Sequence, residues 1–244
     1  MRVLFVDLET APCLSWVWGM YEQNVIDVKK SWYILAFAYK WQGEKKIHTK
    51  AITDFKQADP EDDYGLCKKL HSLISQADLV VAHNGKRFDR RKSHARFIKH
   101  NLPPCTHIKW YDTLQLARAE FGFLSNKLND LGAYLNIGRK LPHTGFDLWK
   151  RCMRRERKAI KKMKAYNARD VWLLEKVFDR LKPWAKRLPD AAEHECNSCL
   201  STHLNRRGPV RKSKTRFQFV CRECGHWQVK TVETKHGERN RRRS

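Results

Sequence analysis

Three groups of acidic residues, far apart in the sequence, have the types and spacing that could do chemistry. Asp7 and Glu9 follow the apolar run Val3–Val6, and alternation along a strand places both carboxylates on one face. Carboxylates this close repel each other, and burying one is costly unless it is paired or binds a metal. An isolated DxE could also be a strand that simply ends in a solvated loop.

Two further acidic positions lie beside predicted elements. Asp89 ends HNGKRFD (residues 83–89), where Asn84-Gly85 predict a tight turn from a short buried strand into a helix. Asp170 ends YNARD inside a helical stretch, four residues after Tyr166 and therefore on the same helix face. Each has an ordinary structural explanation as well, because aspartate is favourable at a helix N-terminus and Tyr–Asp pairs on helices are common.

Taken together and in this order, the groups resemble the motifs of the DEDD superfamily of DnaQ-like 3′–5′ exonucleases. VDLET is similar to the first motif, and HNGKRFD is similar to the second as it occurs in the proofreading domains of family B DNA polymerases. YNARD is similar to the third motif in the YxxxD form of the tyrosine (DEDDy) branch. The resemblance, which includes YDTLQLAR and SNKLNDLGAYL, covers about residues 1–182 and implies an α/β fold with a ribonuclease H-like mixed sheet.

The resemblance also implies an active site that holds two Mg²⁺ or Mn²⁺ ions. Asp7 would bridge both ions, Glu9 and Asp170 would complete the ion that activates water, and Asp89 would complete the ion at the leaving group. Tyr166 would orient the attacking water by a hydrogen bond, since a phenol with a pKa near ~10 is a poor base. Hard cations require oxygen ligands, and a pair of them can activate water and stabilise the leaving 3′ oxygen of a phosphodiester.

Several other residues near the motifs have a functional and a structural interpretation. His83 and Asn84 could touch substrate or stabilise the turn, and Asp112 is expected to cap a helix. His143 could approach the site, although a solvated loop histidine is the simpler interpretation. The basic residues around Asp89 depart from the family pattern and could bind the substrate backbone or alter metal affinity; they are Lys86, Arg87, Arg90 and Arg91.

Apolar periodicity indicates the elements that must position these residues. It predicts strands over 3–6, 32–41, 46–52, 79–82 and 108–111, with residues 10–30 as a loop. Helices are predicted over 62–76 and 87–100, after Asp112-Thr113, after a Ser125 cap, and over 148–181, this last region being either one helix or two. The loop carries Trp16, Trp18 and Tyr21, which could stack on terminal bases, although we expect at least one of them in the core.

Four cysteines near the C-terminus form two CxxC pairs, ECNSC and VCREC. Cys196, Cys199, Cys221 and Cys224 match the spacing of a zinc site, and four thiolates leave no open position, so the Zn²⁺ would be structural. The segment resembles a zinc ribbon with RFQFVC and HWQVKTV as its hairpin. We therefore expect a nuclease domain over 1–186, a zinc ribbon over 187–234, and a basic disordered tail over 235–244.

The charge of the chain points to a polyanionic partner. The sequence contains 50 Lys and Arg against 26 Asp and Glu, a net charge of +24, and such a surplus favours nucleic acid. The candidate nucleic-acid contacts combine positions of the second motif with basic residues between the cysteine pairs: Asn84, Lys86, Arg87, Arg206, Arg207, Arg211, Lys212, Lys214 and Arg216.

These features predict a metal-dependent 3′–5′ exonuclease that releases nucleoside 5′-monophosphates, with DNA favoured over RNA and single-stranded or frayed ends as substrate. An endonuclease of the same fold, or a binding protein with a weak nuclease site, are the alternatives. No apolar run reaches the ~20 residues of a membrane span, and no signal segment precedes the first strand, so we expect a cytoplasmic protein. Proofreading would require a replication or repair protein as partner.

Overall fold

The computed structural model describes residues 2–21, 24–56, 59–105, 108–142, 144–185, 195–197, 201–210, 215–223 and 225–231. The chain forms two compact units, one over residues 2–178 and the other from Asp179 onward. Among the helices of the described residues, none combines the length and the apolar character that crossing a membrane requires.

A five-stranded mixed sheet with the order β5-β4-β1-β6-β7 forms the centre of the first unit. β1 pairs antiparallel with β4 and parallel with β6, so the strand that carries Asp7 and Glu9 is central. β1 and β4 are almost continuously buried, as expected for strands covered on both faces. The strands are β1 (Val3–Thr10), β4 (Ile34–Trp41), β5 (His48–Ala51), β6 (Leu79–Ala82) and β7 (Lys109–Asp112).

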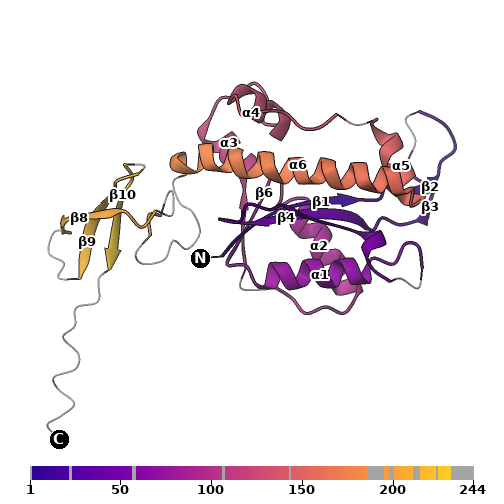
Figure 1. Ribbon diagram of the computed structural model, residues 1–244, viewed down its shortest axis with the longest axis horizontal. Coiled ribbons are helices and arrows are strands. Elements are labelled where there is room, and N and C mark those ends of the chain that lie inside the picture. Colours follow the sequence, from indigo (N-terminus) through magenta and orange to yellow (C-terminus); the bar gives the residue numbers. More distant parts are fainter. Residues whose placement is uncertain are drawn as a thin grey trace, which may run out of the picture. The chain divides into compact units, whose positions relative to one another are not determined.

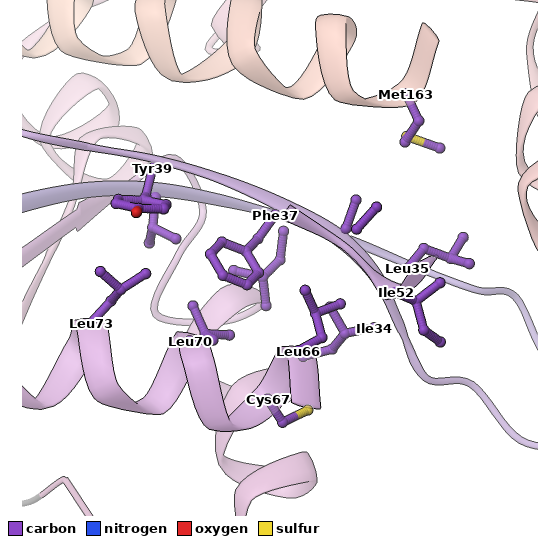
Figure 2. Packing of buried hydrophobic residues seen from close by; sticks show 14 of the residues in the cluster. Ile34, Leu35, Phe37, Tyr39, Ile52, Leu66, Cys67, Leu70, Leu73 and Met163 are labelled. Atoms are coloured by element: carbon purple, nitrogen blue, oxygen red, sulfur yellow. The ribbon is translucent and has the colours of Figure 1, made fainter. Parts of the chain in front are cut away.

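Helices cover the two faces of this sheet. Figure 1 shows α6 along one face and α1 with α2 on the other. In Figure 2, Leu66, Leu70 and Leu73 of α1 point toward Phe37 of β4, while Met163 of α6 lies on the opposite side of the strands. The helices are α1 (Tyr64–Ser75), α2 (Asp89–Lys99), α3 (Thr113–Glu120), α4 (Leu128–Tyr134), α5 (Phe146–Met153) and α6 (Arg157–Leu181), with 3₁₀ turns at Ile52–Asp54 and Lys182–Trp184.

Most of the predicted elements are confirmed, including the break of the last helical region into α5 and α6. The break falls at Arg155, whose φ of 61° cannot continue a right-handed helix. The helix cap at Asp112 is also confirmed, because its carboxylate accepts the N–H of Leu114 at 3.0 Å. Ser125, in contrast, does not cap α4: its hydroxyl donates to the carboxylate of Asp130 at 2.6 Å, and Lys127 occupies the N-cap position.

The segment that was expected to be a loop contains a second, two-stranded sheet. β2 (Leu14–Trp16) pairs antiparallel with β3 (Asp27–Lys30), and the N–H of Ile26 donates to the carbonyl of Trp16 at 3.0 Å. The expectation that at least one aromatic residue of this segment is in the core is wrong. The side chains of Trp16, Trp18 and Tyr21 are all exposed.

The described residues of the second unit form a three-stranded antiparallel sheet with the order β10-β9-β8. β9 (Arg216–Cys221) and β10 (Trp227–Thr231) form the hairpin predicted for the ribbon, and β8 (Leu204–Pro209) is a strand that the sequence pattern did not indicate. The buried side chain of Gln228 joins the hairpin to the first cysteine pair, because its amide oxygen accepts the N–H of Asn197 at 2.6 Å.

Candidate metal-dependent active site

Three of the predicted carboxylates converge at the end of β1. The side chains of Asp7 and Glu9 meet that of Asp170, which α6 brings across the sheet, and the carboxylate oxygens of the three residues lie within 4.8 Å of one another. A buried ion pair between Lys40 of β4 and Glu175 of α6 helps to fix the helix on the sheet at this position. Residues more than 160 positions apart therefore form one acidic site.

Asp89 borders this group without belonging to it. It is the first residue of α2, is 2% exposed, and accepts the backbone N–H of Leu8 at 3.0 Å. Because Leu8 lies between Asp7 and Glu9, this bond holds the second motif against the first. The structure thus brings all four predicted carboxylates to the same end of β1.

The turn that positions Asp89 is held by Asp112 from β7. The two carboxylate oxygens of Asp112 accept the backbone N–H groups of Asn84 at 2.9 Å and Lys86 at 3.1 Å. Asn84 has a φ of 63°, a left-handed conformation that asparagine tolerates. Gly85 is required for a different reason, since a Cβ there would lie 2.3 Å from the Cβ of Ala82.

The acidic site contains more negative charge than its neighbours neutralise. Burial and then the charge of Asp170 raise the pKa of Asp7 to about 7. Burial and the charge of Asp7 likewise raise the pKa of Glu9 and of Asp89 well above their usual values. A divalent cation would relieve this repulsion, and the all-oxygen donor set fits hard cations such as Mg²⁺ or Mn²⁺.

Lys140 is a site residue that the sequence did not indicate. Its ammonium lies 2.6 Å from the Asp170 carboxylate, and its positive charge lowers the pKa of Asp7 and of Glu9. The loop that carries it is fixed by the Lys140 N–H, which donates to the side-chain oxygen of Asn129 at 3.0 Å. Lysines are frequent in this region of the sequence, so no local pattern distinguishes this one from its neighbours.

Asn167 is a second residue that was missed, although the sequence carried a signal for it. Its amide donates to both the carbonyl and the carboxylate of Asp7, at 3.1 and 2.5 Å. It lies three positions before Asp170 on the same helix, a spacing that puts both side chains on one face. The fully buried amide therefore orients the central carboxylate of the site.

Tyr166 lies at the edge of the site with its ring against Trp149, at a centroid distance of 6.4 Å. Its hydroxyl oxygen lies 3.4 Å from the Lys140 ammonium. Burial and the charge of Asp170 raise the pKa of the phenol to about 12. The hydroxyl is therefore protonated at neutral pH and can donate a hydrogen bond, as the expected role in orienting water requires.

The remaining candidates of the first unit separate into structural and exposed residues. Burial lowers the pKa of His83 to about 4, and the neutral ring donates from Nε2 to the Asn126 carbonyl while Nδ1 bonds the Thr113 hydroxyl, so it is a packing residue. Arg87 is exposed and Lys86 partly so, as contact with nucleic acid would require. His143 lies outside the described residues.

A second cluster with possible metal ligands has no such charge excess. The buried carboxylate of Asp63 accepts hydrogen bonds from Arg96 Nε at 2.8 Å and Nη2 at 2.5 Å, and the Ile34 N–H at 2.8 Å, next to Cys67 and His100. The hydrogen bonds from Arg96 and Ile34 outweigh burial and lower the pKa of Asp63. This cluster is an internal ion pair that joins α1 and α2 to β4.

The second unit offers sulfur donors in place of oxygen. The side chains of Cys196 and Cys221 are buried, and the N–H of Gly225, with a φ of 72°, donates to the Cys221 carbonyl at 3.0 Å in a tight turn. Thiolate ligands suit Zn²⁺. The other two predicted ligands, Cys199 and Cys224, lie outside the described residues.

The basic candidates of the second unit are exposed where the structure describes them. Arg206 and Arg207 of β8 and Arg216 of β9 are all exposed, and the guanidinium of Arg206 lies 3.4 Å from the ring centroid of Phe217. An arginine over an aromatic ring leaves its outer face open to a phosphate or a base. Arg211, Lys212 and Lys214 lie outside the described residues.

Comparison with known proteins defines the class of the first unit. A model of the RNase_H superfamily matches residues 4–182, and the chain belongs to this superfamily. The fold is similar to that of a family B DNA polymerase from the hyperthermophilic archaeon Pyrobaculum calidifontis, with a TM-score of 0.53 and 15% sequence identity. The match covers 75% of this chain and 24% of the polymerase chain. A search of curated proteins finds no match.

Proposed function

We propose that the protein is a metal-dependent 3′–5′ exonuclease that hydrolyses phosphodiester bonds at the 3′ ends of nucleic acid. The observation that carries the proposal is the convergence of Asp7, Glu9 and Asp170 within 4.8 Å, with Asp89 bonded to the intervening backbone. Membership of the RNase_H superfamily supports a nuclease. The fold similarity to a DNA polymerase supports DNA as the favoured substrate.

The residues of the site would have separate roles in the reaction. Two divalent ions, when bound, would supply an activated water and stabilise the leaving 3′ oxygen. The four carboxylates would hold the ions, with Asp7 central and oriented by the amide of Asn167. Tyr166, protonated at neutral pH, would donate a hydrogen bond to the attacking water and fix its direction.

The direct test is a degradation assay with 5′-end-labelled single-stranded DNA, duplex DNA and RNA of one sequence, in Mg²⁺ or Mn²⁺. We expect a ladder of 3′-shortened products from single-stranded DNA, and nucleoside 5′-monophosphates as the released product. Asp7→Asn is the matched control and should give no ladder. Cutting of a closed single-stranded circle would instead favour an endonuclease, and binding without any cleavage would contradict the proposal.

We also propose that Cys196, Cys199, Cys221 and Cys224 hold one structural Zn²⁺. The burial of Cys196 and Cys221 beside tight turns supports this, as does the small size of the segment, which a bound metal would help to fold. Metal analysis of the undenatured protein should find one zinc per chain, and Cys221→Ser should lower this value. Purified protein without zinc would contradict the assignment.

A further inference from the structure

An arm of exposed aromatic residues lies next to the active site in the sequence and has no role in the proposed chemistry. The arm consists of β2, β3 and the described residues between them, 14–21 and 24–30. The side chains of Trp16, Trp18 and Tyr21 are 58%, 88% and 79% exposed. Large apolar side chains are rarely left in water together unless they form an interaction site.

The arm is continuous with the active site through an aromatic cavity. β1 carries Glu9 and ends at Thr10, and the arm begins four residues later. The connecting residues and α5 together line a cavity of about 410 Å³, formed by Thr10, Ala11, Pro12, Gly145, Phe146 and Trp149. Because Trp149 also packs against Tyr166, this cavity lies between the proposed water-orienting residue and the chain segment that leads into the arm.

Positive charges accompany the aromatic rings along this path. The ammonium of Lys29 lies 5.3 Å from the ring centroid of Trp16, and that of Lys150, which also lies 4.0 Å from the carboxylate of Asp147, is 5.9 Å from the ring centroid of Phe146. Lys30 is paired with Glu61 and adds no free charge. Exposed rings next to lysines are complementary to a partner that offers flat apolar faces and negative charge together, as unpaired nucleotides do.

We propose that the arm binds single-stranded nucleic acid by stacking the bases of nucleotides that lie 5′ to the bond being cut on Trp16, Trp18 and Tyr21. The assignment of these nucleotides to the 5′ side rests on the proposed 3′–5′ exonuclease function, whereas the stacking itself does not. Paired bases offer no free faces, so the arm would give the enzyme a preference for single strands over duplex.

The test measures binding without added Mg²⁺ or Mn²⁺, conditions under which no cleavage is expected, by fluorescence anisotropy of labelled oligothymidine and oligouridine. The double variant Trp18→Ala, Tyr21→Ala should bind about tenfold or more weakly than the wild type, since each stacked base contributes ~1–3 kcal/mol. Equal losses with both oligonucleotides would indicate no sugar selectivity at the arm, and a larger loss with one would identify its preferred strand.

Three controls separate stacking from other effects. Trp18→Phe, Tyr21→Phe keeps the rings and should retain most of the affinity. Leu124→Ala and Ile98→Ala remove similarly exposed side chains from the loop before α4 and from α2, respectively, and should leave the affinity unchanged. An abasic oligonucleotide should bind wild type and the double-alanine variant equally, because it keeps the phosphates and lacks the bases.

Unchanged affinity in the double-alanine variant would overturn the arm proposal, even if cleavage is normal. The proposal would also be wrong if the wild type is a dimer and the double-alanine variant is a monomer with unchanged affinity, since the arm would then be a protein interface. Conversely, the wild type could cleave nothing in Mn²⁺ while the Trp18→Ala, Tyr21→Ala variant binds more weakly than the wild type. The proposed exonuclease function would then be wrong, and the role of the arm would stand.

Discussion

At the scale of single residues, the surroundings of a buried carboxylate determine whether it favours metal binding or stabilises the fold. Glu9 and Asp63 are acidic residues with opposite surroundings. The pKa of Glu9 is raised well above its usual value by burial and by Asp7 and Asp170, while the pKa of Asp63 is lowered by its hydrogen bonds from Arg96 and Ile34. The first site has one cation of the chain, Lys140, for three clustered carboxylates, whereas the single carboxylate of the second is paired with Arg96.

We predict that Glu9→Gln stabilises the metal-free protein and reduces cleavage by at least about 100-fold. The amide removes one of several like charges, which should raise the melting temperature in EDTA, and it removes a metal ligand, which typically costs several kcal/mol of transition-state stabilisation. Asp63→Asn is the matched control and should lower the melting temperature, because it removes a charge that is paired. A lower melting temperature for Glu9→Gln would contradict the charge excess.

A second prediction concerns the pH dependence that Asp7 gives the metal-free protein. Its pKa is raised from 3.8 to about 7 in the folded state, so the folded state holds a proton that the unfolded state has lost. The contribution of Asp7 to stability is therefore full below pH ~4 and is lost as the pH rises through about 7. The melting temperature of wild type minus that of Asp7→Asn, measured in EDTA, should fall over this interval.

Taking the difference between the two proteins cancels the opposite contribution of His83, whose pKa is lowered to about 4 and which gains stability as the pH rises from ~4 to ~6.5. Adding Mn²⁺ to the wild type should abolish the fall of this melting-temperature difference with pH. A difference that does not change with pH would mean that Asp7 titrates normally and that the site is not short of positive charge.

The four carboxylates were predicted from the resemblance of their motifs to a known family, and each of them lies on or beside an element with a clear apolar pattern. Lys140 could not be predicted in this way, since it lies in a loop whose position depends on bonds to Asn129 and on the approach of α6. Residues on regular elements have a direction that periodicity gives, whereas a loop residue acquires its direction only from the folded chain.

At the scale of elements, Asp112 connects β7 to the turn before α2 and so determines where Asp89 lies. We predict that Asp112→Asn lowers the free energy of unfolding by about 1–3 kcal/mol, because the amide group would face a backbone N–H that the carboxylate accepted. Cleavage should fall with it as the turn moves. Differential scanning calorimetry and the cleavage assay on the same preparation measure both effects.

Asp78→Asn is a suitable comparison for Asp112→Asn. The Asp78 carboxylate accepts the backbone N–H of Arg2 at 2.5 Å just before β6, at the strand end opposite to the β6–α2 turn, and any loss of stability should leave cleavage per folded molecule unchanged. If Asp112→Asn keeps full activity, the turn does not depend on this carboxylate for its position.

The elements show why a helix or a core strand is easier to predict than an exposed hairpin. α1 and β4 bury regular apolar faces, so the periods of their sequences are visible. β2 and β3 are short, exposed, and shifted in register between Leu14 and Ser15. Because neither strand has a buried face, no sustained apolar pattern marks them in the sequence. The segment was therefore expected to be a loop.

At the scale of the whole molecule, a net charge of +24 predicts that binding to nucleic acid depends strongly on salt. Arg206, Arg207 and Arg216 are the exposed basic candidates of the ribbon. If each contacts one phosphate of a single strand, replacing all three by glutamine should reduce the slope of log K against log salt by about 2. Anisotropy titrations over a salt series, without added Mg²⁺ or Mn²⁺, measure this slope.

Deleting residues 190–244 should reduce affinity and slope further, because it also removes Arg211, Lys212 and Lys214. If neither the triple variant nor the deletion changes the slope, the second unit has only a structural role. Zinc content should remain at one per chain in the triple variant, which separates lost contacts from an unfolded ribbon.

The most direct measurement of the central claim is anomalous scattering from crystals of the protein grown with Mn²⁺. We predict manganese between the carboxylates of Asp7, Glu9 and Asp170, at the distances of direct coordination, with Asp89 beside it. Manganese bound elsewhere on the protein, with none among these carboxylates, would contradict the claim that they form a metal-dependent nuclease site.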